Sequence, residues 1–322
     1  MDITIKEMAE KLKECSEYRI VYHIRPDGDC IGSAYALCLA LQAIGKKCEV
    51  VGTHPVPNQH CSMTNRVVMD KVESPVYIAV DSASPQRVGI YSNQHFTFCI
   101  DHHNTPFENV DYRYVETDCG ACSEIIFKLI KEMKVPITKQ IADFLYMAIV
   151  TDTMSFRTSD TRVQTFEIAT ELARLGADTY HISRHFMFLK SKGRLEVEQR
   201  LRNSFHFSCG DRVLTGIIML SDLEAAGVLD SELEGINSLV DEVIGVGIGV
   251  TIRELSDGRM RCSVRTSGDL SADEFCKIHG GGGHFHAACC ELDCGAPAAR
   301  RIMEDSARTF LEKHSNVEGY HG

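Results

Sequence analysis

The sequence lacks several features that would each assign a broad class. It has no run of about 18 or more apolar residues, so we expect no membrane span. It has no long Lys/Arg run and its formal net charge is −11, which argues against electrostatic binding of long duplex nucleic acid. Residues 1–7 resemble the start of an amphipathic helix and lack the basic-then-apolar order of a signal peptide. These absences predict a cytoplasmic protein whose substrates are small and anionic.

The 14 cysteines do not form the dense pattern of a short secreted disulfide protein. Most lie within apparent helices and strands, where buried thiols are common. Cys119 and Cys122 have CxxC spacing, but a second cysteine pair at matching spacing is missing, so a structural role is favoured over zinc or redox chemistry. His54 and His60 lie in a loop-rich segment (residues 53–68) without local partners, and we expect both at the surface.

The order of apolar runs predicts an α/β fold with a mostly parallel sheet flanked by helices in residues 1–189. A run of β-branched and aromatic residues at 18–22 reads as a buried strand, and the helix that follows it ends near Gly45. The other predicted strands are 48–52, 76–80 and 96–100, and the other predicted helices are 2–17, 123–133, 137–150, 162–175 and 179–189.

The chain length suggests about two domains. Residues 190–203 are highly charged, and we expect a solvated linker helix there. Residues 204–322 then predict a smaller α/β domain with hairpins at 204–219 and 247–266. Its helices are expected at 233–242, 271–278 and 296–313, with a small-residue segment at 287–290 and a tail that frays after His314.

Acidic and imidazole side chains follow several predicted elements of the first domain. They are His23, Asp27, Asp29, Asp81, His102, His103 and Asp152. Each Asp alone reads as a helix cap, but the carboxyl ends of parallel strands share one edge of a sheet, where ligands bind. Carboxylates gathered there without cations would repel one another, and a metal pair removes that conflict. Mixed His and Asp ligands suit manganese, magnesium or zinc, and the lack of cysteine argues against a structural zinc site.

Four sequence blocks, HIRPDGDCIGS, VDSAS, DHHN and TDTMSF, resemble the ordered motifs of the DHH phosphoesterase family. Arg265 and the GGGGH block that ends at His284 resemble the DHHA1 C-terminal domain. The resemblance covers nearly the whole chain and is strongest to the branch of oligoribonucleases (nanoRNases) that also act as 3′-phosphoadenosine 5′-phosphate (PAP) phosphatases. The GGGGH block separates the chain from manganese inorganic pyrophosphatases, which share only the first domain.

The resemblance implies two divalent metal ions, with manganese expected first and magnesium as the alternative. One ion would be held by His23, Asp27 and Asp81, and the other by Asp29, Asp81, His102 and Asp152, so that Asp81 bridges. The two ions would activate a shared hydroxide for in-line attack on phosphorus. His103 would serve as an acid or a phosphate contact, and Asp101 would orient the neighbouring histidines.

The resemblance also assigns substrate binding to Arg265, Gly281, Gly282, Gly283 and His284. Backbone N–H groups of a glycine run approach a phosphate without obstruction by Cβ atoms, and an arginine pairs with two phosphate oxygens. The alternative for the glycine run alone is a flexible hinge. The sequence departs from the family pattern at Met154 and Cys290, where glycine is usual, and Met154 is expected to narrow the mouth of the site.

The activity implied is hydrolysis of short oligoribonucleotides to mononucleotides, together with removal of phosphate from PAP to give AMP. The alternatives are hydrolysis of linear dinucleotides from cyclic-dinucleotide turnover (pApA or pGpG) and a non-catalytic nucleotide-binding regulator. Family resemblance also implies a homodimer, although no surface in the sequence identifies an interface.

Overall fold

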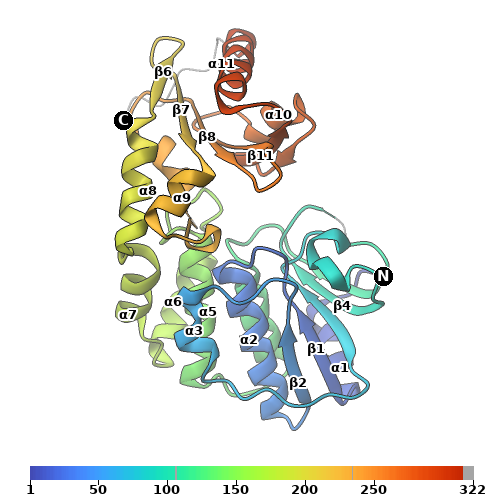
Figure 1. Ribbon diagram of the computed structural model, residues 1–322. Helices are drawn as coiled ribbons and strands as arrows, with labels where there is room; N and C mark the ends of the chain where they lie inside the picture. The colour runs from blue at the N-terminus through green and yellow to red at the C-terminus, as the bar shows by residue number, and fades with distance from the viewer. Residues whose placement is uncertain (106, 234, 315–322) are drawn as a thin grey trace. The chain divides into compact units, whose positions relative to one another are not determined.

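The computed structural model describes residues 1–105, 107–233 and 235–314 (Figure 1). Contacts divide the chain into two compact units, Met1–Leu189 and Lys190–Gly322. The tail for which we expected fraying, residues 315–322, lies outside the described residues. No helix in the described part of the chain combines the length and the apolar character that crossing a membrane requires.

The first unit is built on a five-stranded parallel sheet, which confirms the predicted fold class. The strand order is β2-β1-β3-β4-β5, with β1 at Glu17–Val21, β2 at Lys47–Val51, β3 at Val76–Val80, β4 at Phe96–Asp101 and β5 at Val110–Val115. Strand β5, which was not predicted, is a half-exposed edge strand of alternating polar and aromatic residues. The central strands β3 and β4 match the predicted apolar runs.

Helices cover one face of this sheet. Alternate strand residues such as Ile20 and Ile78 pack in the main core with α1 (Ile5–Glu14), α2 (Gly28–Ala43), α4 (Cys122–Glu132) and α5 (Lys139–Asp152). The intervening residues, such as Val21 and Ala79, face a smaller core that includes Val88 of the 3₁₀ segment η1 (Pro85–Tyr91). This alternation is the period of two that a pleated strand imposes.

The remaining helices of the first unit are α3 (Asn58–Thr64), α6 (Val163–Arg174), α7 (Thr179–Ser183) and the π-helical turn η2 (Arg184–Phe188). Two predictions were wrong here. The segment expected to be a loop contains α3, and its His60 is fully buried against the ring of Phe186 instead of lying at the surface. The helix expected at 179–189 is two short turns of different pitch.

Glycine at position 32 lets α2 and α5 approach closely. A Cβ atom at Gly32 would lie 2.5 Å from the carbonyl oxygen of Phe144 and 2.7 Å from the Cβ atom of Ala148. Asp29 and Asp152 are carried by these two helices. The close approach therefore helps to bring the two carboxylates to one place.

We expect Gly32→Ala to lower the free energy of unfolding by about 1–3 kcal/mol, because the added methyl group overpacks the helix pair. Urea unfolding followed by circular dichroism measures the loss. Gly295→Ala, which places its methyl group in open space, is the control and should cost less than about 1 kcal/mol. Equal effects of the two substitutions would show that α2 and α5 separate without cost.

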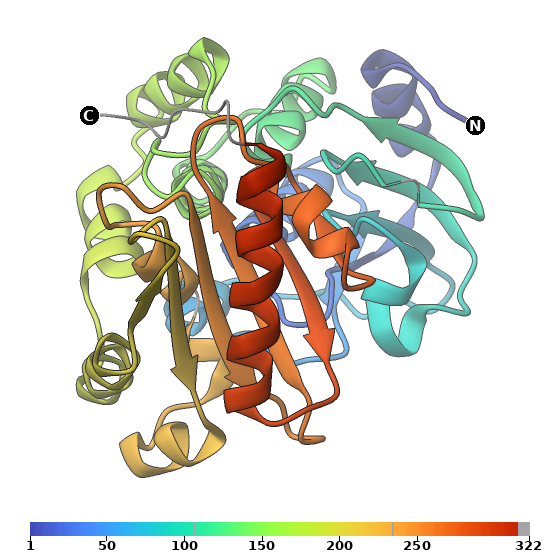
Figure 2. The ribbon, with the colours of Figure 1, turned by 90° about the horizontal axis from the view of Figure 1, so that it is seen from above.

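The second unit has a six-stranded mixed sheet in the order β10-β11-β9-β8-β7-β6. The strands are β6 (His206–Ser208), β7 (Val213–Ile218), β8 (Ile248–Glu254), β9 (Met260–Thr266), β10 (Gly282–Gly283) and β11 (Ala287–Leu292). Both predicted hairpins are present as antiparallel pairs, β6 with β7 and β8 with β9. The long helix α11 (Ala296–Lys313) lies across one face of this sheet (Figure 2).

Two expectations for the second unit were wrong, the helix at 233–242 and the fully solvated linker helix, and two elements were not predicted. The helix predicted at 233–242 is replaced by two short 3₁₀ segments, η3 (Asp230–Leu233) and η4 (Ile236–Val240). The small-residue segment at 287–290 is part of strand β11, and α9 (Leu220–Ala226) was not predicted. The charged segment forms the helix α8 (Lys192–Asn203), but it is not solvated all round, since it buries Val197 and Leu201. The remaining helix, α10 (Ala272–Lys277), lies within the predicted range.

Candidate metal centre

The seven predicted polar residues lie at the ends of neighbouring elements of the first unit. His23 follows β1, Asp81 follows β3, and His102 and His103 follow β4. Asp27 is the N-cap of α2, where its carboxylate accepts the backbone N–H of Cys30 at 3.0 Å. Asp29 lies in the first turn of α2, and Asp152 is the last residue of α5. The parallel topology thus places them at the carboxyl edge of the sheet.

One carboxylate, that of Asp81, faces histidines on both sides. Its Oδ2 atom lies 3.7 Å from Nε2 of His23, and its Oδ1 atom lies 3.4 Å from Nε2 of His102. Asp27 Oδ2 lies 3.2 Å from the same nitrogen of His23. This is the arrangement that a carboxylate bridging two cations requires.

The second side of the cluster gathers around His102. Its Nε2 atom lies 3.9 Å from Asp29 Oδ2 and 3.7 Å from Asp152 Oδ2. Three sets of side chains are close enough to hold an ion: His23 with Asp27 and Cys30, Asp81 with His102 and His103, and Asp29 with His102 and Asp152. The assignment of individual ligands stays a prediction, but the residues named for both ions lie together.

The electrostatics of the cluster fit divalent cations. Burial, with the charge of Asp81, raises the pKa of Asp29 to about 7. Burial also raises the pKa of Asp152, with the charges of neighbouring carboxylates such as Asp29 acting in the same direction. Nε2 of His23 and Oδ1 of Asp81 are buried and make no hydrogen bond with the described residues. Crowded carboxylates and orphaned buried atoms of this kind are satisfied by hard cations that accept oxygen and imidazole ligands.

Cys30 joins the first of these sets, although the sequence analysis did not name it. Its thiol is buried and lies 3.4 Å from the backbone oxygen of Asp27. Burial, together with the charge of Asp27, raises the pKa of the Cys30 thiol. The thiolate form that binds metals is thereby disfavoured, so we do not count Cys30 among the candidate ligands.

Asp101 organises the loop that carries the two histidines. Its Oδ1 atom accepts the backbone N–H groups of His102 at 2.7 Å and His103 at 3.0 Å and lies 2.7 Å from Nδ1 of His103. Its Oδ2 atom accepts the backbone N–H of Ala83 at 2.6 Å. Burial opposes its ionisation, but the bonds from His103 and from the backbone lower the pKa of Asp101 to about 2. Asp101 is therefore a charged anchor that fixes the His103 ring.

The CxxC segment supports the Asp29 carboxylate through backbone N–H groups and not through its sulfur atoms. Both thiols are free and buried. The backbone N–H groups of Cys122 and Ser123, at the start of α4, donate to Asp29 at 2.6 and 3.1 Å. The side chain of Ser33 donates to the same carboxylate at 3.0 Å. These supports of Asp29 carried no signal in the sequence because they depend on how the helices pack.

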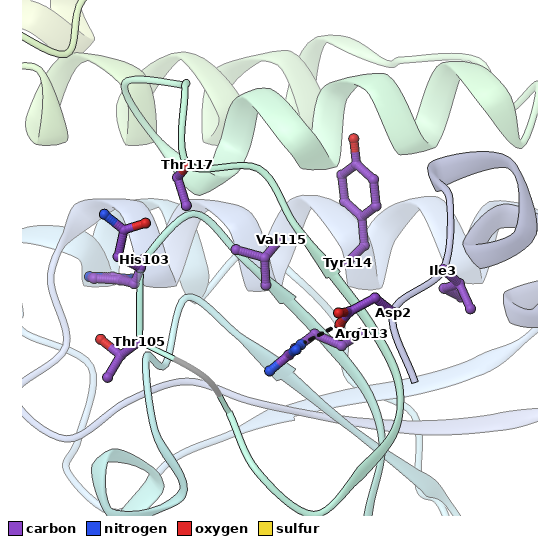
Figure 3. Close-up of a pocket in the computed structure, with 9 residues that line it drawn as sticks. Asp2, Ile3, His103, Thr105, Arg113, Tyr114, Val115 and Thr117 are labelled. Atoms are coloured by element: carbon purple, nitrogen blue, oxygen red, sulfur yellow. Dashed lines mark hydrogen bonds and ion pairs between the residues drawn. The ribbon is translucent and has the colours of Figure 1, made fainter.

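A polar pocket of about 320 Å³ lies beside His103 (Figure 3). Its walls come from the start of the chain, the loop after β4 and strand β5, and its far side holds the ion pair of Asp2 with Arg113 at 2.7 Å. Thr105 and Thr117 add hydroxyl groups. The pocket was not predicted because one of its walls is β5, a strand without a clear sequence pattern.

The predicted substrate residues lie in adjacent strands of the second unit. Arg265 of β9 is opposite Ala287 of β11, and β11 pairs in turn with β10, which consists of Gly282 and Gly283. The backbone N–H of Gly283 donates to Asp273 at 3.0 Å, and that of His284 donates to Ala287 at 2.8 Å. A Cβ atom at Gly281 would run into the carbonyl of Cys289 and the side chain of Cys290. The glycine run is thus an ordered part of the sheet edge, which argues against the flexible-hinge reading.

Met154 occupies a left-handed backbone position, with φ at 47°, and Ser155 and Phe156 that follow have φ of 60° and 64°. Glycine, which is usual at this place in the motif, adopts such a conformation without steric cost. The departure from the family pattern therefore strains the turn after α5.

We expect Met154→Gly to raise the free energy of unfolding by about 1 kcal/mol, because it removes the left-handed penalty of a side chain. Chemical denaturation measures the change. Lys134→Gly, at another left-handed position with φ of 61°, should bring a similar gain. Destabilisation by Met154→Gly alone would mean that the packing of the methionine side chain outweighs the backbone strain.

The chain is similar to known proteins in sequence and in fold. Residues 17–149 match the DHH family, N-terminal domain. The chain is 29% identical over 279 residues to the bifunctional oligoribonuclease and PAP phosphatase NrnA of Thermus thermophilus, covering 84% of this chain and 82% of that protein. It is 29% identical over 174 residues to a probable manganese-dependent inorganic pyrophosphatase of Streptococcus equi, covering 50% of this chain and 56% of that protein.

Among solved structures, an exopolyphosphatase-related protein from Bacteroides fragilis superposes with a TM-score of 0.86 at 20% identity, covering 96% of each chain. At this identity the likeness shows the fold alone. The matched family domain contains the residues from His23 to His103 and ends just before Asp152. Residues 17–149 thus match the N-terminal domain of the DHH family, and a relative that aligns over most of the chain is named as an oligoribonuclease and PAP phosphatase.

Proposed function

We propose that this chain is a metal-dependent phosphoesterase that hydrolyses short oligoribonucleotides to mononucleotides and also removes phosphate from PAP. The observation that carries the proposal is the placement of Asp81, whose two carboxylate oxygens face His23 on one side and His102 on the other. The relative from Thermus thermophilus, named for both activities, aligns over most of both chains and supports the substrate class.

Two divalent cations would be held by the residues already described: one by His23, Asp27 and Asp81, and the other by Asp29, Asp81, His102 and Asp152. When bound, such ions offset charge on phosphoryl oxygens and lower the pKa of water. Manganese is the ion we expect first, because the ligands are carboxylate and imidazole groups and a relative is named as manganese-dependent.

His103 is the proposed proton carrier. The hydrogen bond to Asp101 engages its Nδ1 atom, so Nε2 is the ring atom that does not face this carboxylate. Nδ1 also lies 3.4 Å from Asp81 Oδ1, which places the ring at the edge of the centre. From there the imidazole is positioned to donate a hydrogen bond to a phosphoryl oxygen or a proton to the leaving oxygen.

Hydrolysis of a matched panel, with manganese supplied, tests the proposed function. The panel contains pApA, a five-residue RNA, a long single strand, PAP and pyrophosphate. Fast turnover of the short RNAs and of PAP, with little turnover of the long strand, is the expected result. Turnover of pyrophosphate alone would contradict the proposal, as would exclusive turnover of linear dinucleotides, which would favour a role in cyclic-dinucleotide breakdown. No turnover of any member in the presence of bound metal would favour a nucleotide-binding regulator.

The second unit is proposed to bind a substrate phosphate through Arg265 and the segment from Gly281 to His284. We expect Arg265→Ala to raise KM for pApA by roughly 10- to 100-fold, because a charge-assisted hydrogen bond to phosphate is lost, while kcat changes little. Steady-state kinetics measures both constants. Arg259→Ala, which removes an exposed arginine paired with Asp257 and Glu291, is the matched control. An unchanged KM in Arg265→Ala would show that this arginine does not bind the substrate.

A further inference from the structure

Arg87 is a cation beside the metal centre that the proposed ligand set does not use. It lies in η1, which follows β3 and Asp81 in the chain. Its backbone carbonyl accepts the N–H of Ile24 at 2.6 Å, so Arg87 is held against the residue next to His23. Burial and the charge of Arg87 oppose the rise in the pKa of His23 that Asp27 causes, and Arg87 acts with His23 to lower the pKa of Asp27 against the effect of burial. Arg87 therefore adds positive charge to the side of the site where the first ion would be held.

The backbone around Arg87 is fixed by hydrogen bonds. The hydroxyl of Thr53 donates to the carbonyl of Val88 at 3.1 Å and accepts the N–H of Ile90 at 2.9 Å. Val88 is fully buried, and Gly89 has a φ of 62° and leaves no room for a Cβ atom next to Ile24 and Thr53. The backbone that carries Arg87 is thus well anchored.

The guanidinium group of Arg87 makes no hydrogen bond or ion pair with any residue in the described ranges, and the residue is partly buried. Asp27, a carboxylate on which the charge of Arg87 acts, already has both oxygens in contact with other groups, one with Cys30 N at 3.0 Å and one with His23 Nε2 at 3.2 Å. A guanidinium group offers five donors in a planar fork that matches the oxygens of a phosphate. An unpaired arginine at this place is suited to an anion that arrives from outside.

We propose that Arg87 binds a non-bridging oxygen of the phosphate that is positioned at the metal centre. The inference rests on the proposed function for the identity of the phosphate ester. The contact with Arg87 itself would form with any phosphate held at the metal centre. Arg87 would add a protein-borne positive charge where the substrate brings negative charge into a site already lined by four carboxylates. The competing interpretation is a solvated surface arginine with no role in binding.

Titration calorimetry with inorganic phosphate, on the full chain loaded with manganese, tests the inference. The variants are Arg87→Gln, which removes the positive charge, and Arg87→Lys, which keeps the positive charge but lacks the planar fork of hydrogen-bond donors. Arg66→Gln is the control, since Arg66 is exposed, lies outside the site and loses the same charge. We expect Arg87→Gln to weaken phosphate binding by roughly 10- to 100-fold, Arg87→Lys to weaken it less, and Arg66→Gln to leave it within about twofold.

Manganese titration of each variant without phosphate separates phosphate binding from metal binding. We expect the manganese affinity of Arg87→Gln to equal or exceed that of the unsubstituted chain, because a positive charge beside the ligands is removed. Equal phosphate affinity in Arg87→Gln and Arg66→Gln would overturn the inference, as would a loss that merely follows a loss of manganese. These measurements need no turnover, so they stand even if the substrate panel contradicts the proposed function.

Discussion

Replacing Asp81 by asparagine is expected to lower kcat for pApA by about a thousandfold or more while leaving the fold intact. The reason is geometric. The two oxygens of this single carboxylate lie 3.7 Å from His23 Nε2 and 3.4 Å from His102 Nε2, so its loss affects both halves of the centre at once. An amide keeps the shape of the side chain but removes its charge and turns one oxygen into a hydrogen-bond donor.

The control for this substitution is Asp111→Asn, which removes a carboxylate of the same unit that pairs with His95 at the surface. Its kcat should stay within about twofold of the unsubstituted value. Circular dichroism and thermal unfolding establish that both variants are folded. Turnover by Asp81→Asn at the rate of the unsubstituted chain would exclude a bridging role for Asp81.

The buried strands of the first unit were predictable because their environment leaves a clear trace in the sequence. A central parallel strand is covered on both faces, so β3 appears as an unbroken apolar run. The edge strand β5 has neighbours on one side only and alternates polar with aromatic residues, which made it indistinguishable from a loop. The helix predicted at 233–242 failed for another reason. Its apolar residues Ile236 and Leu239 are buried, but at the shorter spacing of a 3₁₀ segment.

Residues that act at strand ends were also predictable, since the chain order of β1, β3 and β4 brings their carboxyl ends to one edge. The supports of these residues were not. Asp29 is held by the backbone of Cys122 and Ser123, more than ninety residues further along the chain, and no local pattern marks that contact. Arg87 escaped notice because its position depends on how η1 packs against Ile24 and Thr53.

The stabilisation of the protein by manganese is expected to be larger at pH 8 than at pH 6. In the metal-free protein, burial and the charge of Asp81 raise the pKa of Asp29 to about 7, against an ordinary value of about 3.9. A carboxyl group whose pKa is raised on folding stabilises the folded state fully below pH 4, and this contribution is lost as the pH rises through 7. For the fully buried Asp29, the raised pKa corresponds to a contribution of up to about 4 kcal/mol to the free energy of unfolding. The neighbouring carboxylates make the ionised form of Asp29 unfavourable.

His102 adds to the same trend. Burial lowers the pKa of His102, but the contact of its Nε2 with Asp81 Oδ1 at 3.4 Å and the neighbouring carboxylates raise it more, so protons compete with the cation at this ligand too. Metal binding requires the ligands to release their protons, and the release is easier at high pH. Manganese at about a hundredfold excess over its dissociation constant should then stabilise the protein by about 2.7 kcal/mol at pH 8 and by less at pH 6 for the same total concentration.

Thermal unfolding with manganese or with a chelator, at both pH values, measures the effect. Asp29→Asn should raise the stability of the chelated protein at pH 8 and shrink its response to manganese, because it removes a crowded charge and a ligand together. Asp111→Asn should behave like the unsubstituted chain. If manganese raised the unfolding temperature equally at both pH values, or more at pH 6, manganese would bind away from the carboxylates at this edge of the sheet.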